Sequence, residues 1–506
     1  MAAVSSAGQA NGDLALERPG GHVIDGEWFA ASSGEWIDVE DPSTRAVFSS
    51  IASGTDSDID RAVEAARRSF NSGSWSRAVP ADRGRILWRL SELVRSNREA
   101  LARLESQDSG KPICESREDM AGTADAFEYY AGLASKVVGQ TLPLPGNQLG
   151  LLFRVPVGVV GAITPWNFPI FVTAWKVAPA LCCGNSVVLK PPQLASLTSL
   201  ALAQLALRAG VPAGVFNVVT GPGLIAGAHL AGHPDVDVLA FTGGTDAGRS
   251  VMRARAEVVR PVQLELGGKS PNVIFADANL ELAVAGAAFG IFYTQGENCN
   301  AGSRLIVEDS IYDEFLARLK AKTEAIRVLP ALDESSQLGA LISQDQLDRV
   351  ASYVEVGLRD GASLVTGGHR LEGGAYGNGH FYAPTILADV RPHHRVFREE
   401  IFGPVVTVTP FHGDDEAIEL ANATEFGLAA GVWTASVDRV MRFIREVDSG
   451  YVWVNTYNAT PIEAPFGGVK SSGFGRDCGT QAIDTYTTWK TVAWATAPFS
   501  DWYSPH

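Results

Sequence analysis

Cysteine is scarce in this sequence, and its scarcity limits the chemistry that the chain can carry. Only five cysteines occur among 506 residues, at Cys114, Cys182, Cys183, Cys299 and Cys478. Their number is odd and their spacing irregular, so a disulfide framework is not expected. No CxxC or mixed Cys/His pattern indicates zinc, and the sequence predicts no metal site.

Positive charge is also in short supply. Lys and Arg number 41 against 57 Asp and Glu, which gives a formal net charge of −16. Nucleic acid is therefore a poor partner, because phosphate binding needs a basic face. A small anionic cofactor remains open, since backbone N–H groups and one lysine can hold it.

Signal peptides and uninterrupted apolar runs are absent as well. Residues 1–20 are small and polar, without a basic-then-apolar pattern, and are expected to form a flexible tail. The most apolar region, residues 155–190, is interrupted too often by Pro, Asn, Gly and Lys to span a membrane. We therefore expect a soluble cytoplasmic protein with no membrane partner.

Strand-like and helix-like segments alternate through much of the chain. Short strands are expected over residues 20–55, and helical spacing begins at Asp56. From residue 157, apolar runs such as "VGVVGAI", "SVVLK" and "VDVLAF" alternate with helices. This order is typical of parallel βαβ units in a doubly wound sheet, which binds ligands beyond the carboxyl ends of its strands. A second α/β block follows, to about residue 470.

Glycine is abundant, at 52 residues, and two Gly-rich turns follow predicted strands. "GPGLIAG" contains Gly221, Gly223 and Gly227, although the third glycine comes one residue late for GxGxxG. "TGGTDAGR" places Gly243 and Gly244 before a helix, whose free N–H groups suit a pyrophosphate. Each turn alone is weak evidence, because such turns are often only turns.

Lys190 ends the predicted strand "SVVLK" and is followed by two prolines. At that position it suits a ribose hydroxyl or a phosphate. A solvated lysine explains the same feature equally well.

Cys299 lies in the polar run "GENCNAGS", whereas Cys182 and Cys183 lie in an apolar helix and are interpreted as buried hydrophobes. A polar turn near a helix could favour the thiolate. The local sequence leaves a nucleophile and an ordinary thiol equally open.

Two further residues suit thiol-based carbonyl chemistry. Glu265 ends a predicted strand in "QLELGG", where a carboxylate could act as a general base or form an ion pair. Asn167, in the proline-flanked "TPWNFP", could donate to an oxyanion or cap a turn.

Together these stretches resemble the aldehyde dehydrogenase superfamily, from about residue 22 to 493. The matching stretches are "TPWNFP", "KPP", "FTGGTDAGR", "ELGGKSP", "GENCNAGSR", "EEIFGPV", "GLAAGVWT", "WVN" and "PFGGVKSSGFGRD". The resemblance implies oxidation of an aldehyde to its acid with NAD(P)+. It also implies a Rossmann-like cofactor domain, a second α/β catalytic domain and a small β arm for oligomerisation.

The resemblance implies a role for each catalytic residue. Cys299 would attack the aldehyde as a thiolate, and Asn167 with the backbone N–H of Cys299 would hold the oxyanion. Glu265 would activate the water that hydrolyses the resulting thioester. Lys176 would lie behind these groups. The carboxylate of Glu265 favours release of the free acid over transfer to coenzyme A.

The resemblance also implies a cofactor site. The expected contacts are Ile163, Trp166, Lys190, Gln193, Gly223, Gly227, Phe241, Gly243, Gly244, Glu400 and Phe402. Two positions depart from the family pattern. Gln193 replaces a glutamate that favours NAD, so NAD is expected and NADP is left open. Gly244 replaces a frequent serine, which removes one pyrophosphate contact.

By the same resemblance, the aldehyde would pass Phe168, Val172, Trp175, Tyr293, Asn298, Asn300 and Phe466. Aromatic walls suit aliphatic or aryl chains, and also cations. Asp119 and Glu463 are expected near the mouth. We therefore hypothesise an amino- or betaine-type aldehyde. The alternatives are a broadly specific aliphatic or aromatic aldehyde dehydrogenase, a thiol esterase and a non-catalytic member of the fold.

Domain boundaries follow from the same comparison. Residues 21–137 and 157–266 are expected to form the dinucleotide-binding domain, and residues 267–470 the catalytic domain. Residues 138–156 and 480–500 would form the arm. Assembly through such arms implies a homodimer or homotetramer.

Overall fold

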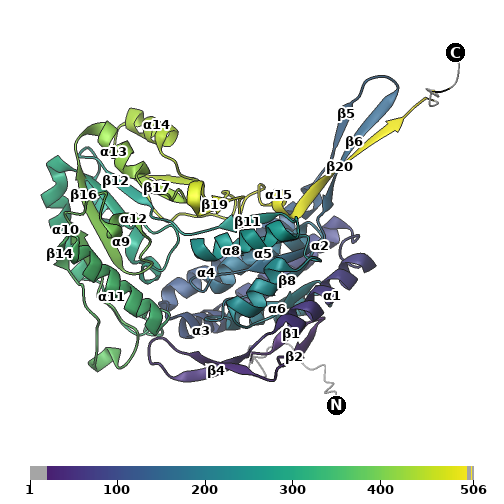
Figure 1. Ribbon diagram of the computed structural model, residues 1–506, viewed down its shortest axis with the longest axis horizontal. Helices are drawn as coiled ribbons and strands as arrows, with labels where there is room; N and C mark the ends of the chain where they lie inside the picture. The colour runs from purple at the N-terminus through teal and green to yellow at the C-terminus, as the bar shows by residue number, and fades with distance from the viewer. Residues whose placement is uncertain (1–19, 498–502, 504–506) are drawn as a thin grey trace.

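The computed structural model describes residues 20–497 and residue 503. The predicted tail therefore lies outside the described residues except for Gly20, as do the last three residues of the predicted arm. Figure 1 shows two lobes side by side and a narrow arm that projects from one of them. No helix within the described ranges is long and apolar enough to cross a membrane. The cytoplasmic location stays a prediction.

The first lobe is built on an eight-stranded sheet. In sheet order its strands are β19 (Gly473–Phe474), β11 (Val262–Glu265), β10 (Val238–Thr242), β7 (Val159–Ile163), β8 (Ser186–Lys190), β9 (Phe216–Val218), β1 (His22–Ile24) and β2 (Glu27–Phe29). The strands from β11 to β9 are parallel, and the others pair antiparallel at the two edges. Every residue of β7, β8 and β10 is buried, as an apolar run covered on both faces requires.

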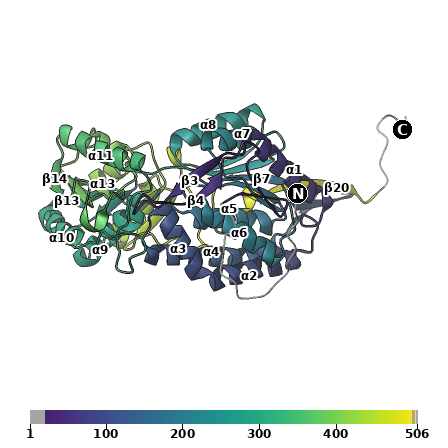
Figure 2. The same ribbon diagram turned by 90° about the horizontal axis from the view of Figure 1, so that it is seen from below.

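Helices cover both faces of this sheet, as Figure 2 shows. One face packs against α1 (Asp56–Ser72), α7 (Ala228–Gly232) and α8 (Thr245–Glu257). The other face packs against α5 (Pro169–Cys182) and α6 (Leu197–Ala209), and α2 (Pro80–Ser96), α3 (Arg98–Ser109) and α4 (Ile113–Leu133) form a further layer on these two helices. The helix predicted to begin at Asp56 does so, with a capping box between Thr55 and Asp58.

The second lobe contains a seven-stranded sheet. In order its strands are β14 (Ser363–Thr366), β15 (Thr385–Ala388), β16 (Val405–Phe411), β13 (Arg304–Glu308), β12 (Pro271–Ile274), β17 (Ala429–Trp433) and β18 (Tyr451–Val454). On one face lie α9 (Leu280–Phe292) and α10 (Tyr312–Glu324). On the other lie α11 (Gln344–Arg359), α12 (Arg395–Arg398), α13 (Gly413–Asn422) and α14 (Val437–Glu446).

The projecting arm is a three-stranded antiparallel sheet of β5 (Gln140–Pro143), β6 (Gln148–Pro156) and β20 (Thr487–Ala495). β20 returns to β6 from the far end of the chain, after α15 (Ile483–Tyr486). A separate hairpin consists of β3 (Trp36–Glu40) and β4 (Val47–Ala52). Two α/β lobes and an antiparallel arm confirm the predicted fold class, whereas the domain boundaries stay predictions.

Candidate active site

A cleft of about 1530 Å³ lies at the carboxyl ends of the parallel strands β11, β10, β7 and β8, and a loop from the second lobe completes it. Lys190, Thr242 and Glu265 are the last residues of β8, β10 and β11, and all three line it. Cys299 lines it from the loop after α9. The predicted location beyond the strand ends is therefore where the structure places these residues.

Backbone conformation and glycine spacing set the position of Cys299. The preceding η3 turn (Tyr293–Gly296) holds Thr294 and Gln295 at φ 51° and 55°, a left-handed region that non-glycine residues seldom adopt. Opposite the loop, a Cβ at Gly268 would lie 2.5 Å from the carbonyl oxygen of Cys299. Glycine at position 268 thus lets the turn after β11 approach the backbone of Cys299.

Cys299 and Glu265 influence each other's ionisation. Burial, followed by the nearby Glu265 carboxylate, raises the pKa of the Cys299 thiol well above its usual value. Burial also raises the pKa of Glu265 to about 8. The expectation that a polar turn favours the thiolate is therefore wrong for the resting site, because desolvation outweighs the turn's donors. A base beside the thiol is needed to ionise it.

A buried ion pair lies behind Glu265. Lys176 on α5 donates to Asp477 Oδ2 at 2.9 Å and to Gln263 Oε1 at 3.3 Å. Lys176 favours the ionised form of Glu265, and Asp477 opposes it. Oε1 of Glu265 has no hydrogen-bond partner within the described ranges, so it is free to accept a proton. Asp477 was quoted within a matching stretch but given no role from sequence.

Asn167 lines the cleft between β7 and α5. Its Nδ2 donates to the carbonyl of Glu297, which precedes Cys299 by two residues, at 2.8 Å. This contact ties the amide to the loop of the thiol. An amide nitrogen has two donors, so one remains for an oxyanion.

Most residues expected at the cofactor line the same cleft. They are Ile163, Trp166, Lys190, Gln193, Gly223, Phe241, Gly243, Gly244, Glu400 and Phe402. Lys190 is buried, and burial lowers the pKa of its ammonium to about 8, so the solvated-lysine alternative is wrong. Gly244 is the N-cap of α8, which directs backbone donors toward the cleft. Gly227 is not among the lining residues; a Cβ there would lie 3.8 Å from the Lys190 side chain.

Glu400 and Phe402 are held in place by the neighbouring backbone. Oε1 of Glu400 accepts from the N–H of Gly268 at 2.9 Å, and burial raises the pKa of Glu400 to about 7. Phe402 has φ 63° and its carbonyl accepts from Gln346 of α11. The rings of Phe402 and Trp166 meet edge to face at 5.2 Å, which joins the two lobes across the cleft.

The model of the aldehyde dehydrogenase family matches residues 28–492, which is nearly the whole chain. The chain belongs to the aldehyde dehydrogenase family. It is 42% identical over 484 residues to a betaine aldehyde dehydrogenase of Bacillus subtilis, covering 95% of this chain and 99% of that protein. It is 43% identical over 472 residues to the NADP/NAD-dependent aldehyde dehydrogenase PuuC of Escherichia coli, covering 93% and 94%.

A solved structure agrees with these relatives. The crystal structure of a Staphylococcus aureus betaine aldehyde dehydrogenase in complex with NAD+ matches with a TM-score of 0.95 and 37% identity. The match covers 97% of this chain and 98% of that one. The chain is therefore an NAD(P)-dependent aldehyde dehydrogenase, and identity of this order leaves its substrate open.

In this aldehyde dehydrogenase, aromatic rings line the cleft on the other side of the thiol. Phe168 stacks on Tyr293 with centroids 6.3 Å apart, and Trp175 contacts Phe171 at 4.9 Å and Phe466 at 5.3 Å. The lining includes all the residues expected at the substrate: Phe168, Val172, Trp175, Tyr293, Asn298, Asn300 and Phe466.

Carboxylates on α4 lie beside these rings. Glu115, Glu118 and Asp119 line the cleft, and all three raise the pKa of Tyr293, after the larger effect of its burial. Asp119 is buried and forms an ion pair with Lys111, whose Nζ lies 3.9 Å from the centroid of Phe168.

Sequence reasoning placed Asp119 correctly at the cleft but missed Glu115 and Lys111. The spacing of Glu115 and Asp119 by four on a predicted helix was a usable sign that they share a face. Glu463, in contrast, is exposed and does not line the cleft.

Proposed function

We propose that Cys299 and Glu265 carry out aldehyde oxidation as a nucleophile and its base. Cys299 Sγ forms a bond to the aldehyde carbon after its proton passes to Glu265, whose Oε1 has no partner in the described structure. The remaining Asn167 N–H and the backbone N–H of Cys299 donate to the oxyanion of the thiohemiacetal. The adjacent Lys176–Asp477 ion pair acts on the pKa of Glu265 in both directions, since Lys176 lowers it and Asp477 raises it. The Glu265 carboxyl can therefore accept and release protons.

The cofactor half of the cleft fits a dinucleotide. A helix N-terminus at Gly244, an open glycine turn at Gly223 and the buried ammonium of Lys190 supply donors for an anionic ligand. Glu400 suits a ribose hydroxyl. When bound, the nicotinamide accepts the hydride that leaves a thioester on Cys299. Glu265 first releases the thiol proton to solvent. It then takes a proton from the water that hydrolyses this thioester and passes it to the departing thiolate, which returns the free thiol and a carboxylic acid.

The proposed substrate is an amino- or betaine-type aldehyde. This proposal rests on one observation: aromatic rings and three carboxylates line the same wall of the cleft. The carboxylates are Glu115, Glu118 and Asp119. Lys111 neutralises Asp119. Glu118 pairs with Arg98 at 3.5 Å but is 73% exposed, and Glu115 accepts hydrogen bonds from the N–H and the hydroxyl of Thr294. Both carboxylates still favour a cation in the cleft. Burial raises the pKa of Glu115 to about 8, so a bound cation would also favour its ionised form. The name of the Bacillus subtilis relative is consistent with this chemistry.

Two aldehydes of nearly the same shape test the charge directly. Betaine aldehyde carries a trimethylammonium group where 3,3-dimethylbutanal carries a tert-butyl group. We expect kcat/KM for betaine aldehyde to exceed that of the neutral isostere by about tenfold, since a partly desolvated cation–π contact contributes about 1–2 kcal/mol. An equal or lower value would favour the alternative of broad aliphatic and aromatic specificity.

A variant on the cleft wall isolates the carboxylate contribution. Glu118→Gln should lower the ratio of kcat/KM for betaine aldehyde to that for 3,3-dimethylbutanal about twofold. The effect is small because the carboxylate is exposed and screened. The matched control is Glu281→Gln, an acid in the first turn of α9 that does not line the cleft, which should leave the ratio unchanged. 4-Aminobutyraldehyde and hexanal extend the same comparison to longer chains.

The arm is proposed to join two copies of the chain into a homodimer, or pairs of dimers into a homotetramer. Phe153, Trp489 and Trp494 are among its exposed side chains, at 47%, 44% and 62%. A projecting sheet with this much apolar surface gains from being covered. Light scattering on the eluting protein should give a multiple of the 53.7 kDa chain. Trp494→Lys should shift it toward the monomer, and a wild-type monomer would contradict the proposal.

A further inference from the structure

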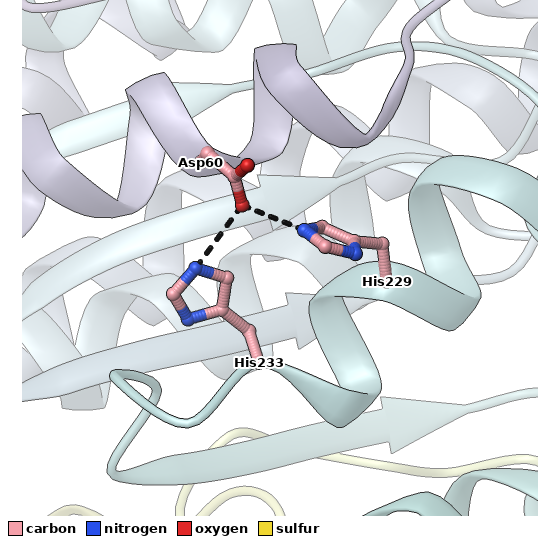
Figure 3. Close-up of side chains that lie close together, drawn as sticks. All are labelled: Asp60, His229 and His233. Carbon is pink, nitrogen blue, oxygen red and sulfur yellow. Dashed lines mark hydrogen bonds and ion pairs between the residues drawn. The ribbon is translucent and has the colours of Figure 1, made fainter.

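Three side chains with metal-ligating atoms lie together on the outer face of the cofactor-binding lobe. Asp60 comes from α1, His229 from α7, and His233 from the residue that follows α7 (Figure 3). One ligand atom from each lies within 4.8 Å of the other two. None of the three is among the residues that line the cleft, so their arrangement has no part in the proposed chemistry of Cys299.

The geometry suits a tetrahedral metal ion. Nε2 of His229 and Nε2 of His233 approach the same oxygen of Asp60, at 2.6 Å and 3.3 Å. Ligand atoms on a tetrahedral Zn²⁺ with bonds of about 2.0 Å lie about 3.3 Å apart. The His233 distance already matches this value. His229 must move outward by roughly 0.7 Å, and it lies at the surface with 32% of its side chain exposed.

The backbone that carries the two histidines is already ordered. They are four residues apart around one helical turn, so their side chains share a face. Buried Arg255 on α8 donates to the carbonyls of Ala231, His233 and Val236, and thereby holds the end of α7 against its neighbours. Chelating side chains on a fixed backbone lose little freedom when a metal binds.

Ring protons are consistent with binding at Nε2. Without a metal, Nδ1 of His233 accepts from the N–H of Asp235 at 3.1 Å, which leaves its proton on Nε2 and directed at Asp60. On binding, each neutral ring keeps one proton, which moves to Nδ1. Asp235 is exposed, so its amide can donate to water instead when the proton moves.

We propose that Asp60, His229 and His233 form a site for a borderline divalent cation, Zn²⁺, with water as the fourth ligand. Two imidazoles and one carboxylate are ligands that Zn²⁺ accepts, and they are poor ligands for Ca²⁺ or Mg²⁺, which prefer oxygen. The ion links α7 to α1. α7 directly follows the π turn of Gly223–Gly227, and Gly223 lines the cofactor cleft. A metal ion bound between α1 and α7 would therefore fix the end of this segment that lies farther from the cleft.

Zinc titration of the untagged full chain tests the site. The protein carries Cys114→Ser and Cys299→Ser, which remove the exposed and the partly exposed thiol of the cleft as competing ligands. We expect one equivalent of Zn²⁺ to bind in competition with a chromogenic chelator. His229→Gln keeps an amide donor for Asp60 but removes a ligand, and should weaken binding by about tenfold to a hundredfold or more. Equal affinity in this variant would overturn the proposal.

Another exposed histidine provides the matched control. His393 contacts His394 and lies on the second lobe, so His393→Gln removes one histidine from a neighbouring pair without touching the cluster. Its affinity for Zn²⁺ should equal that of the parent protein. Loss of binding in His393→Gln alone would place the metal at the wrong pair and contradict the proposal.

Thermal unfolding gives a second readout that does not depend on activity. A ligand that binds only the folded state raises Tm as its concentration rises. Zn²⁺ should raise the Tm of the parent and of His393→Gln, and should raise that of His229→Gln less at the same concentration. The Tm of His229→Gln without metal establishes that the variant is folded. An equal rise in all three proteins would show that Zn²⁺ acts elsewhere.

Discussion

The two halves that we propose for the cleft, one for the cofactor and one for the aldehyde, are lined by different kinds of groups. In the cofactor half, much of the lining is backbone: Gly223, Gly243 and the N-cap Gly244, with Lys190 as a buried cation. In the substrate half, the lining is side chain: aromatic rings from α5 and the end of α9, and carboxylates from α4. Backbone donors suit a diphosphate whatever the neighbouring residues are, so selectivity among aldehydes must come from the side-chain half.

Cys299 lies between the cofactor half and the aldehyde half of the cleft. Its replacement should have the largest effect on catalysis while leaving cofactor binding intact. Cys299→Ser should lower kcat by about 10⁴-fold or more, because it removes the proposed nucleophile. NADH formation at 340 nm measures this loss. Binding of NAD+ should stay within about twofold of wild type, since the cofactor half is intact. Loss of NAD+ binding together with kcat would show that the two halves of the cleft are not independent.

Glu265→Gln should have the next largest effect. Loss of the base should lower steady-state kcat by about 10²–10⁴-fold. The variant keeps the shape of the side chain, so KM for the aldehyde should change little. A kcat near that of wild type would assign proton transfer to another group, and the same measurement with Lys176→Met would show whether the ion pair supplies it.

Asn167→Ala should lower kcat by about 10²–10³-fold, because one oxyanion donor is lost. The expected fall is in kcat with little change in the KM of either substrate. A rise in KM with unchanged kcat would instead assign Asn167 to ground-state binding. Because Asn167 also contacts Glu297, the Tm of the variant should be compared with that of wild type.

The pH dependence should follow Glu265. Its pKa of about 8 means that the carboxylate is the minor form at pH 7 and becomes the major form above pH 8. As pH falls below about 8, kcat/KM should therefore decrease about tenfold per unit, and it should level off above. In Glu265→Gln this inflection should disappear. A flat wild-type profile from pH 6 to 8 would contradict a base with a raised pKa.

The smallest expected effect lies at the edge of the cofactor half. Gln193→Glu places a carboxylate where a 2′-phosphate would approach, and like charges at close range in water repel by about 1 kcal/mol. The ratio of kcat/KM for NADP+ to that for NAD+ should fall about fivefold. An unchanged ratio would place the 2′ position away from Gln193.

Much of this site could be predicted from sequence because its parts follow strand ends. Lys190, Glu265 and the Gly243–Gly244 turn each come directly after an apolar run, and parallel strands bring their carboxyl ends to one edge. Cys299 and Asn167 could be selected by their polar, rigid surroundings and by the family resemblance. Their assigned roles stay predictions.

The remainder depends on tertiary packing that local patterns do not encode. The pairing of Lys176 with Asp477 joins residues 301 positions apart, and Asp60 meets His229 across 169 positions. The high pKa of Cys299 follows from burial, which the polar sequence around it did not suggest. Sequence analysis named Lys176 but missed its partner Asp477, and it missed the meeting of Asp60 with His229, because these contacts join distant positions.

Intact-protein and peptide mass spectrometry of the wild-type protein, quenched with acid during the first turnover, tests the central claim most directly. After mixing with NAD+ and an aldehyde that the wild type oxidises, the account predicts one acyl group per chain. That group should be attached to Cys299 and absent when NAD+ is omitted. NADH formation with an unmodified Cys299, or with the acyl group on another residue, would contradict the account.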